Sequence, residues 1–109
     1  MSFQDFKKLD VWLFVRKLTN SIYTVTKEFP NSEQFGLKNQ MRRYAVSVTS
    51  NIAEGCGRNT PKGTLVFLYI PRGSLFESET QLYIAFDQNY IDETFFSTID
   101  EEIQTSKKL

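Results

Sequence analysis

The sequence contains few residues that could carry catalytic chemistry. It has no histidine, and Cys56 is its one cysteine. Nucleophilic catalysis relayed through imidazole, and zinc sites built from histidine or several thiolates, are therefore excluded. Glu77 and Glu79 could serve as the carboxylate pair of a metal-free hydrolase. Side chains two residues apart on a helix point about 200° apart, so this pair could converge only across subunits. We therefore expect no enzyme, no cofactor and no metal site.

A glycine-rich stretch, Gly55-Cys56-Gly57-Arg58, has the composition of a phosphate-binding loop. Such a loop precedes a helix, because the free N–H groups at the helix N-terminus bind the anion. Here the glycines follow a predicted helix and meet its carbonyl end, so we interpret them as a helix stop. Arg58 and Lys62 flank the start of the next helix. They either contact a single backbone phosphate there or are solvated loop charges.

Basic residues gather on the predicted second helix, where Lys38 precedes the pair Arg42-Arg43. Adjacent residues of a helix point about 100° apart, so the two arginines are not expected to form one patch within a subunit. Arg43 is expected to pair with a carboxylate of the third helix, Glu77 or Glu79. Arg42 is then left as the better candidate for contact with a phosphate.

Asn51 and Glu54, near the end of the same helix, are interpreted as members of a polar network with Arg43 and Glu77. Buried polar groups need partners, so such a network would fix the register of neighbouring helices. A carboxylate–amide site is the alternative. Small residues that would let the second and third helices approach closely are Ser47, Ser50, Gly73 and Ser74.

The formal net charge of zero hides an uneven distribution of charged residues. Residues 1–72 hold eleven Lys and Arg against five Asp and Glu, whereas residues 73–109 hold two against eight. Oppositely charged helices could pack as neighbours or associate between subunits. Alternatively, a basic face of the first two-thirds of the chain meets a polyanion.

Hydrophobic periodicity predicts four helices, over residues 8–28, 33–55, 61–88 and 92–105. Asn31 or Ser32 is a plausible N-cap of the second helix, Thr60-Pro61 starts the third, and Asp92 caps the fourth. No strand-like alternation competes with this pattern. The chain of 109 residues is therefore expected to form a single domain over 1–109, an all-α, antiparallel up-down-up-down four-helix bundle.

Two features of the apolar pattern predict contacts between subunits. A second stripe on the first helix, Trp12, Thr19 and Tyr23 with Arg16, is not needed for the main core and favours a subunit contact. The third helix is apolar most of the way round, which is typical of a helix that is central or sandwiched between subunits.

The N-terminal decapeptide has charges but no apolar core of a signal peptide, and no stretch approaches the roughly 18 apolar residues of a membrane span. A cytoplasmic location without membrane contact is therefore expected. The single cysteine fits a reducing compartment.

The predicted second helix closely resembles the signature of the bacterial four-helix bundle proteins, a family that includes proteins encoded in intervening sequences of 23S rRNA genes. The matching residues are Gly36–Arg43, Ala45–Ser47 and Ser50–Gly55. Supporting matches are Asp10–Trp12, Phe29-Pro30, Arg58, and Arg72–Leu75 followed by Glu77, Glu79, Gln81 and Leu82. Together they extend from about Phe6 to Ile91.

The resemblance implies a four-helix bundle that assembles as a ring-like homopentamer and has no known catalytic activity. Relatives of the fold include the accessory variability determinant proteins of diversity-generating retroelements, which bind nucleic acid together with a reverse transcriptase. Nucleic acid, a reverse transcriptase or another protein are thus the partners that the resemblance implies.

Two residues depart from the family pattern. Pro71 stands where a small helix-compatible residue is usual, and Ser78 where an apolar residue is usual. Pro71 predicts a kink near Ile70. Compared with an apolar residue, Ser78 would lose packing contacts in the core, unless it lies at a subunit interface or its hydroxyl bonds a backbone carbonyl one turn back.

The leading hypothesis is a non-enzymatic protein that binds the backbone of RNA or DNA. The residues expected to make these contacts are Arg42, Arg58, Lys62, Lys38 and Arg16. The alternative is a protein-interaction scaffold that binds no nucleic acid.

Overall fold

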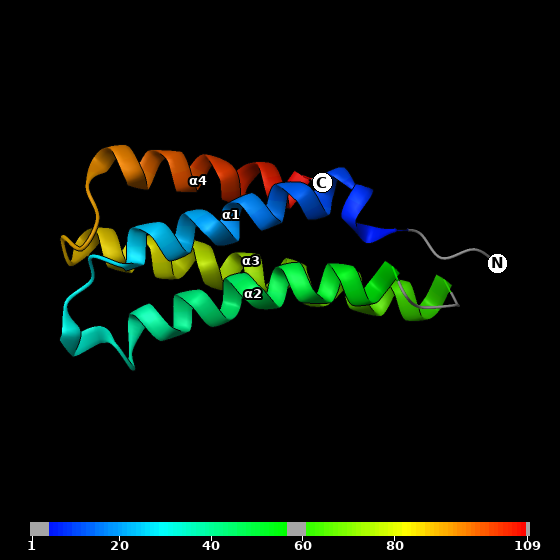
Figure 1. The fold of residues 1–109 in the computed structure, drawn as a ribbon, viewed down its shortest axis with the longest axis horizontal. Helices are drawn as coiled ribbons and strands as arrows, with labels where there is room; N and C mark the ends of the chain where they lie inside the picture. Colours follow the sequence, from blue (N-terminus) through cyan, green and yellow to red (C-terminus); the bar gives the residue numbers. More distant parts are fainter. Residues whose placement is uncertain (1–4, 57–60, 109) are drawn as a thin grey trace.

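The computed structural model describes residues 5–56 and 61–108, with the backbone alone for 61–70. Its four α-helices are α1 (Asp10–Thr26), α2 (Leu37–Cys56), α3 (Pro61–Asp87) and α4 (Glu93–Lys108), with short 3-10 helices η1 (Phe6–Lys8) and η2 (Asn31–Glu33). No strand occurs within the described ranges. The four helices lie along the long axis of the molecule (Figure 1). The predicted all-α class is confirmed.

Hydroxyl groups pin α1 to α2. Thr19 Oγ1 lies 2.7 Å from Thr49 Oγ1 and donates to the carbonyl of Ala45 at 3.1 Å. Seven residues further along α1, Thr26 meets Arg42, which lies seven residues earlier on α2 than Thr49. Later residues of α1 thus contact earlier residues of α2, so these two helices run in opposite directions.

The core is the apolar stripe of each helix turned inward, as the periodicity predicts. In α1 the stripe supplies Val15, Leu18, Ile22 and Val25, and Phe29 follows the helix. The other buried apolar residues are Met41, Ala45, Val48, Ile52, Leu75, Leu82, Ala85, Ile91, Ile99 and Ile103. Burial of these side chains is the main term that holds the helices together.

The second, aromatic stripe of the first helix makes several contacts within the chain. Trp12 is half-buried against the core and meets the edge of Phe6 at 5.1 Å between ring centroids. Thr19 lies in the α1–α2 contact, and Tyr23 lies beneath the guanidinium of Arg42. Tyr23 and Arg16 are nevertheless exposed, so the subunit contact expected for this stripe stays a prediction.

The start of α2 differs from the prediction. The helix begins at Leu37, and the expected caps at Asn31 and Ser32 belong to η2 instead. Glu33 supplies the cap, because its Oε1 accepts the N–H of Leu37 at 3.0 Å. Its Oε2 accepts the hydroxyl of Tyr90 at 2.9 Å, a residue distant in the sequence. A capping-box pattern could not show this partner.

Helix α4 begins as predicted, with Asp92 Oδ1 accepting the N–H of Phe95 at 2.8 Å. The turn before it has Asn89 at a φ of 64°. The N–H of Asn89 bonds the carbonyl of Phe86, and the N–H of Tyr90 bonds that of Ala85, each at 3.0 Å. This is a Schellman motif, in which a left-handed residue satisfies the last carbonyls of α3.

Helix α3 continues through Pro71, and the kink expected near Ile70 stays a prediction. Ser78 is only 3% exposed, and its Oγ has no hydrogen-bond partner among the described residues. The bond to a carbonyl one turn back, which would have compensated for its burial, does not form. Pro71, Ser74, Ser78, Gln81 and Ala85 form one buried line of α3.

Candidate functional site

Arg42 is held against α1 by several contacts. Its Nε donates to Thr26 Oγ1 at 2.9 Å, and its Nη2 donates to the carbonyl of Tyr23 at 3.2 Å. The guanidinium carbon lies 4.5 Å from the centroid of the Tyr23 ring, a cation–π arrangement. Thr26 is fully buried, so one edge of Arg42 is anchored while the rest of the guanidinium stays accessible.

An open hollow of about 540 Å³ lies beside this anchor, and we call it the α1–α2 hollow. Its lining residues are Tyr23, Asn39, Arg42, Arg43, Val46 and Ser47. Both arginines therefore border the same depression, contrary to the expectation that they could form no common patch. Long side chains overcome the angular separation of their Cα–Cβ bonds, and Tyr23 of the neighbouring helix orients Arg42 toward the hollow. No carboxylate is among the described residues that line it.

A second depression lies between α2 and α3, and we call it the α2–α3 pocket. It has a volume of about 310 Å³ and is lined by Gln40, Arg43, Tyr44, Ser47, Glu77 and Gln81. Arg43 and Ser47 belong to both linings, so the two depressions are neighbours on the surface of α2. Gln81 is 5% exposed, and its Oε1 has no hydrogen-bond partner among the described residues.

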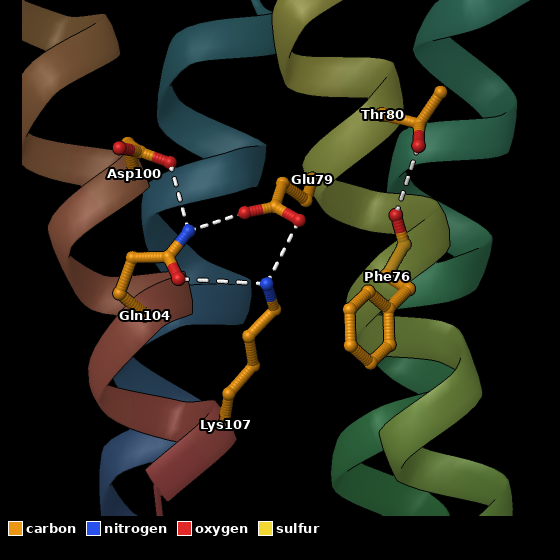
Figure 2. Close-up of polar contacts among 6 residues, drawn as sticks. All are labelled: Phe76, Glu79, Thr80, Asp100, Gln104 and Lys107. Atoms are coloured by element: carbon orange, nitrogen blue, oxygen red, sulfur yellow. Dashed lines mark hydrogen bonds and ion pairs between the residues drawn. The ribbon is translucent and has the colours of Figure 1, made fainter.

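The ion pair predicted for Arg43 does not form in the described part of the chain. Glu79 instead accepts a hydrogen bond from Lys107 Nζ at 2.8 Å and another from Gln104 Nε2. Figure 2 shows this cluster between α3 and α4, with Gln104 also donating to Asp100. Glu77 lines the α2–α3 pocket beside Arg43, without an ion pair to a described residue.

Glu77 and Glu79 therefore occupy different surroundings. Hydrogen bonds from the Lys107 ammonium and the Gln104 amide hold the pKa of Glu79 below its usual range. The carboxylate is thus ionised and tied to α4, whereas Glu77 lies on the exposed side of α3 toward α2. Within this subunit the two carboxylates do not share a site.

Asn51, one member of the predicted polar network, bonds a serine of α2 that contacts α3. Asn51 Nδ2 donates to the carbonyl of Ser47 at 2.7 Å and to Ser47 Oγ at 3.0 Å. Ser47 Oγ lies 3.5 Å from Ser74 Oγ on α3. Asn51 thus acts through two serines that the sequence pattern indicated only as small residues, while Arg43 and Glu77 lie in the pocket.

The other predicted contact residues are spread over the surface. Arg16 is exposed on α1, with its guanidinium carbon 5.5 Å from the centroid of the Trp12 ring. Lys38 is half-buried at the start of α2. Arg58 lies outside the described residues, as does the side chain of Lys62. Glu54 is exposed on the last turn of α2.

Within the described ranges, no group of three or more His, Cys, Asp or Glu side chains is placed to hold a metal ion. Burial raises the pKa of the Cys56 thiol, which disfavours the reactive thiolate. None of the helices in the described part of the chain is long and apolar enough to cross a membrane.

Comparison with known proteins identifies a family and a fold. Residues 7–109 match the family model described as 23S rRNA-intervening sequence protein. A crystal structure of a protein of unknown function from the S23 ribosomal protein family of Bacteroides thetaiotaomicron is similar, with a TM-score of 0.83 and 20% identity. The alignment covers 90% of this chain and 92% of that one. No curated protein matches the chain significantly.

Proposed function

The chain belongs to the 23S rRNA-intervening sequence protein family, and from this premise we propose that it is a non-enzymatic protein that binds the sugar–phosphate backbone of RNA or DNA. The observation that carries the proposal is the α1–α2 hollow, where two guanidinium groups and the Asn39 amide border one depression without a carboxylate. Backbone phosphates are recognised by such groups, because each contact is a charge-assisted hydrogen bond that reads no base.

The two arginines would act differently. Arg42 loses little conformational entropy on binding, because Thr26 and Tyr23 already hold it in place. Arg43 is exposed, makes no ion pair with a described residue, and can turn toward a phosphate in the hollow. One pre-positioned donor group and one adaptable donor group suit a backbone whose exact path varies with sequence.

Further backbone contacts are assigned to other basic residues. Lys38 lies one turn before Arg42 on α2, so both are on one face of the helix. Arg16 lies two turns before Tyr23 on α1, in the direction along which a strand leaving the hollow could run. Arg58 and Lys62 complete the set by their positions in the sequence. Such binding would tolerate different sequences and weaken steeply with salt.

The unit that binds is proposed to be a ring-like homopentamer of up-down-up-down bundles. Exposed apolar side chains of α3 support this assembly, namely Phe76, Tyr83 and Ile84. Apolar side chains of this size are typical of surface that another subunit covers. Five copies of the hollow would then bind one strand, and repetition would strengthen contacts that are weak singly.

The test is filter retention of a labelled oligouridylate of about 20 nucleotides between roughly 50 and 200 mM salt. Arg43→Gln is expected to weaken retention and to lower the slope of log K against log salt by about 0.7 for each phosphate that the protein no longer neutralises. Arg72→Gln is the matched control, because Arg72 is exposed on α3 and lies outside the hollow. It should leave the slope near that of the unmodified protein.

Two results would contradict the proposal. An unmodified protein that retains no oligonucleotide even at the lowest salt would favour the protein-interaction scaffold. Equal slopes for Arg43→Gln and Arg72→Gln would show that the overall charge, and not the hollow, determines binding.

A further inference from the structure

The α2–α3 pocket combines hydrogen-bond acceptors from one helix with donors from another. Glu77 and Gln81 lie one turn apart on α3, so their side chains extend from the same face. Arg43 faces them from α2, beside the half-exposed ring of Tyr44. The volume of about 310 Å³ is at the lower end of the range for small-molecule sites.

The Gln81 amide of this pocket has an oxygen without a hydrogen-bond partner in the described part of the chain. Its side chain is 95% buried, yet its Oε1 has no partner among the described residues. A buried acceptor without a partner destabilises a protein. A ligand donor that bonds this oxygen, after a side-chain rotation that turns it toward the pocket, would remove that cost. The carboxylate of Glu77, on the preceding turn, is a second acceptor without an ion pair to a described residue.

The α2 side of the pocket supplies the opposite pattern. The guanidinium of Arg43 offers several N–H donors and is not consumed by an ion pair within the described part of the chain. Tyr44 provides an aromatic surface on which a planar group can stack. The pocket therefore fits a flat ligand with two neighbouring donors on one edge and an acceptor beside them.

Guanine has this arrangement of donors and acceptors. Its N1–H and its exocyclic amino group are adjacent donors, which a carboxylate and an amide oxygen accept, and its O6 accepts from an arginine. Adenine and uracil do not place two donors side by side on this edge. We propose that the α2–α3 pocket binds an unpaired guanine base of a single-stranded nucleic acid, with Glu77 and Gln81 on its donors and Arg43 on O6.

The position of the pocket connects this site to the backbone contact. Arg43 and Ser47 line both depressions, so a nucleotide whose base enters the α2–α3 pocket, with Arg43 turned to O6, can place its phosphate toward Arg42 in the α1–α2 hollow. For the phosphate contact, though not for the base contact, the inference rests on the proposed function. It adds a preference for guanine to binding that would otherwise be independent of sequence.

The experiment compares two labelled oligonucleotides of about 12 nucleotides, one alternating U and G and the other alternating U and A, by fluorescence anisotropy at equal salt. The unmodified protein is expected to bind the guanine oligonucleotide about tenfold more tightly. Glu77→Gln should reduce this preference to less than about threefold while leaving binding of the adenine oligonucleotide nearly unchanged. Glu101→Gln, which removes an exposed carboxylate of α4, is the matched control and should keep the full preference.

A second measurement separates failure of this inference from failure of the proposed function. The side-chain amide resonances of Gln81 are followed by NMR during titration with guanosine 5′-monophosphate or adenosine 5′-monophosphate. A shift with the guanine nucleotide alone supports the pocket even if no oligonucleotide is retained. Equal affinity for both oligonucleotides, or no shift with guanosine 5′-monophosphate, overturns the inference. A Gln81 shift that depends only on protein concentration also overturns it, because a second copy of the chain would then cover the pocket.

Discussion

At the scale of single residues, the Ser78 hydroxyl is buried without a hydrogen-bond partner among the described residues. Ser78→Ala removes the buried hydroxyl and little volume. We expect the free energy of unfolding to rise by roughly 1 kcal/mol, because the desolvated group no longer has to be accommodated. Urea titration of the two proteins, at matched concentration, measures the difference.

The matched control for this prediction is Ser106→Ala on α4. Ser106 is about as buried as Ser78, but its Oγ donates to the carbonyl of Glu102 at 2.8 Å. The control should therefore show no gain in stability. If both substitutions stabilise the protein equally, alanine's helix propensity is the cause and the unpartnered hydroxyl is not.

Glu102 is a buried acid on α4 with an imperfect environment for its charge. It is 7% exposed, and both carboxylate oxygens accept from Ser21 Oγ at 3.1 Å. Burial raises the pKa of Glu102, with Glu101 adding to the effect, while Ser21 and Lys17 lower it. The pKa of Glu102 is therefore higher in the folded chain than in the unfolded chain, so folding favours the neutral acid. Its contribution to the free energy of unfolding is fully present below the usual pKa of 4.5 and is lost as pH rises through the folded pKa.

The expected result is that Glu102→Gln stabilises the protein at pH 7. Glutamine carries no charge into the buried site and can still accept from Ser21 through its carbonyl. The stability difference from the unmodified protein should shrink as pH falls toward 4.5, where Glu102 itself becomes neutral. Thermal melts over this pH interval test the trend, and a difference that is independent of pH would contradict it.

The candidate site could be predicted from sequence only in part, and Arg42 and Arg43 illustrate the reason. Helix geometry identifies both as basic residues of α2 and suggests that one has a structural role. It assigns that role to Arg43, whereas the structure gives it to Arg42, because the deciding contacts come from Thr26 and Tyr23 on another helix. Likewise, Lys107 competes successfully for Glu79, and no local pattern reveals this long-range partner.

At the scale of the helices, Gly36 lies directly against the carboxylate that caps α2. A Cβ added to Gly36 would lie 2.6 Å from Glu33 Oε1, so Gly36→Ala must displace the carboxylate that caps Leu37 and accepts from Tyr90. We expect a lower melting temperature at neutral pH. Gly36→Ser should behave similarly, since any Cβ meets the same oxygen, and retention of the Tyr90 contact in either variant would contradict the explanation.

The same cap predicts a dependence on pH. The N–H of Leu37 and the hydroxyl of Tyr90 lower the pKa of Glu33, so its stabilising contribution is present above the usual value of 4.5 and disappears as pH falls through the lowered pKa. Glu33→Gln should destabilise the protein at pH 7 and converge with the unmodified protein in acid. Parallel melting curves across this range would show that the charge of Glu33 is not involved.

In the turn between α3 and α4, two substitutions of Asn89 are expected to change stability differently. Asn89 has a φ of 64°, a conformation that glycine adopts freely and β-branched residues avoid. Asn89→Gly should leave stability equal or slightly higher, whereas Asn89→Val should lower it by about 1–2 kcal/mol. Denaturant unfolding of both variants checks this ordering, and similar stabilities would contradict it.

Helix limits were predictable where the signal is local. The proline at the start of α3 and the aspartate before α4 act within one turn, and both helices begin where these residues indicate. The start of α2 is predicted several residues too early, because the residues after Pro30 form a short 3-10 helix and Glu33 caps from four residues away. Local propensity cannot decide between an early and a late start of α2 when a distant residue, here Tyr90, stabilises one of them.

At the scale of the whole molecule, the exposed apolar side of α3 predicts assembly. Ile84 is 45% exposed, so Ile84→Glu should keep the helical content and release subunits from the oligomer. Leu13→Glu is the matched control, because Leu13 on α1 is equally exposed, at 44%. Light scattering should report a pentamer for the control and a smaller particle for Ile84→Glu. A monomeric unmodified protein would contradict the proposed ring.

The chain contains a single tryptophan. Trp12 lies between the ring of Phe6 and the guanidinium of Arg16, at the end of the molecule where η1 meets α1. The chain therefore carries its own fluorophore next to one of the cations proposed to contact phosphate. If a nucleic acid draws Arg16 away from the indole, the emission changes without any label. Association could then be followed in real time by stopped flow, with the optical signal arising from Trp12 beside the proposed contact residue Arg16.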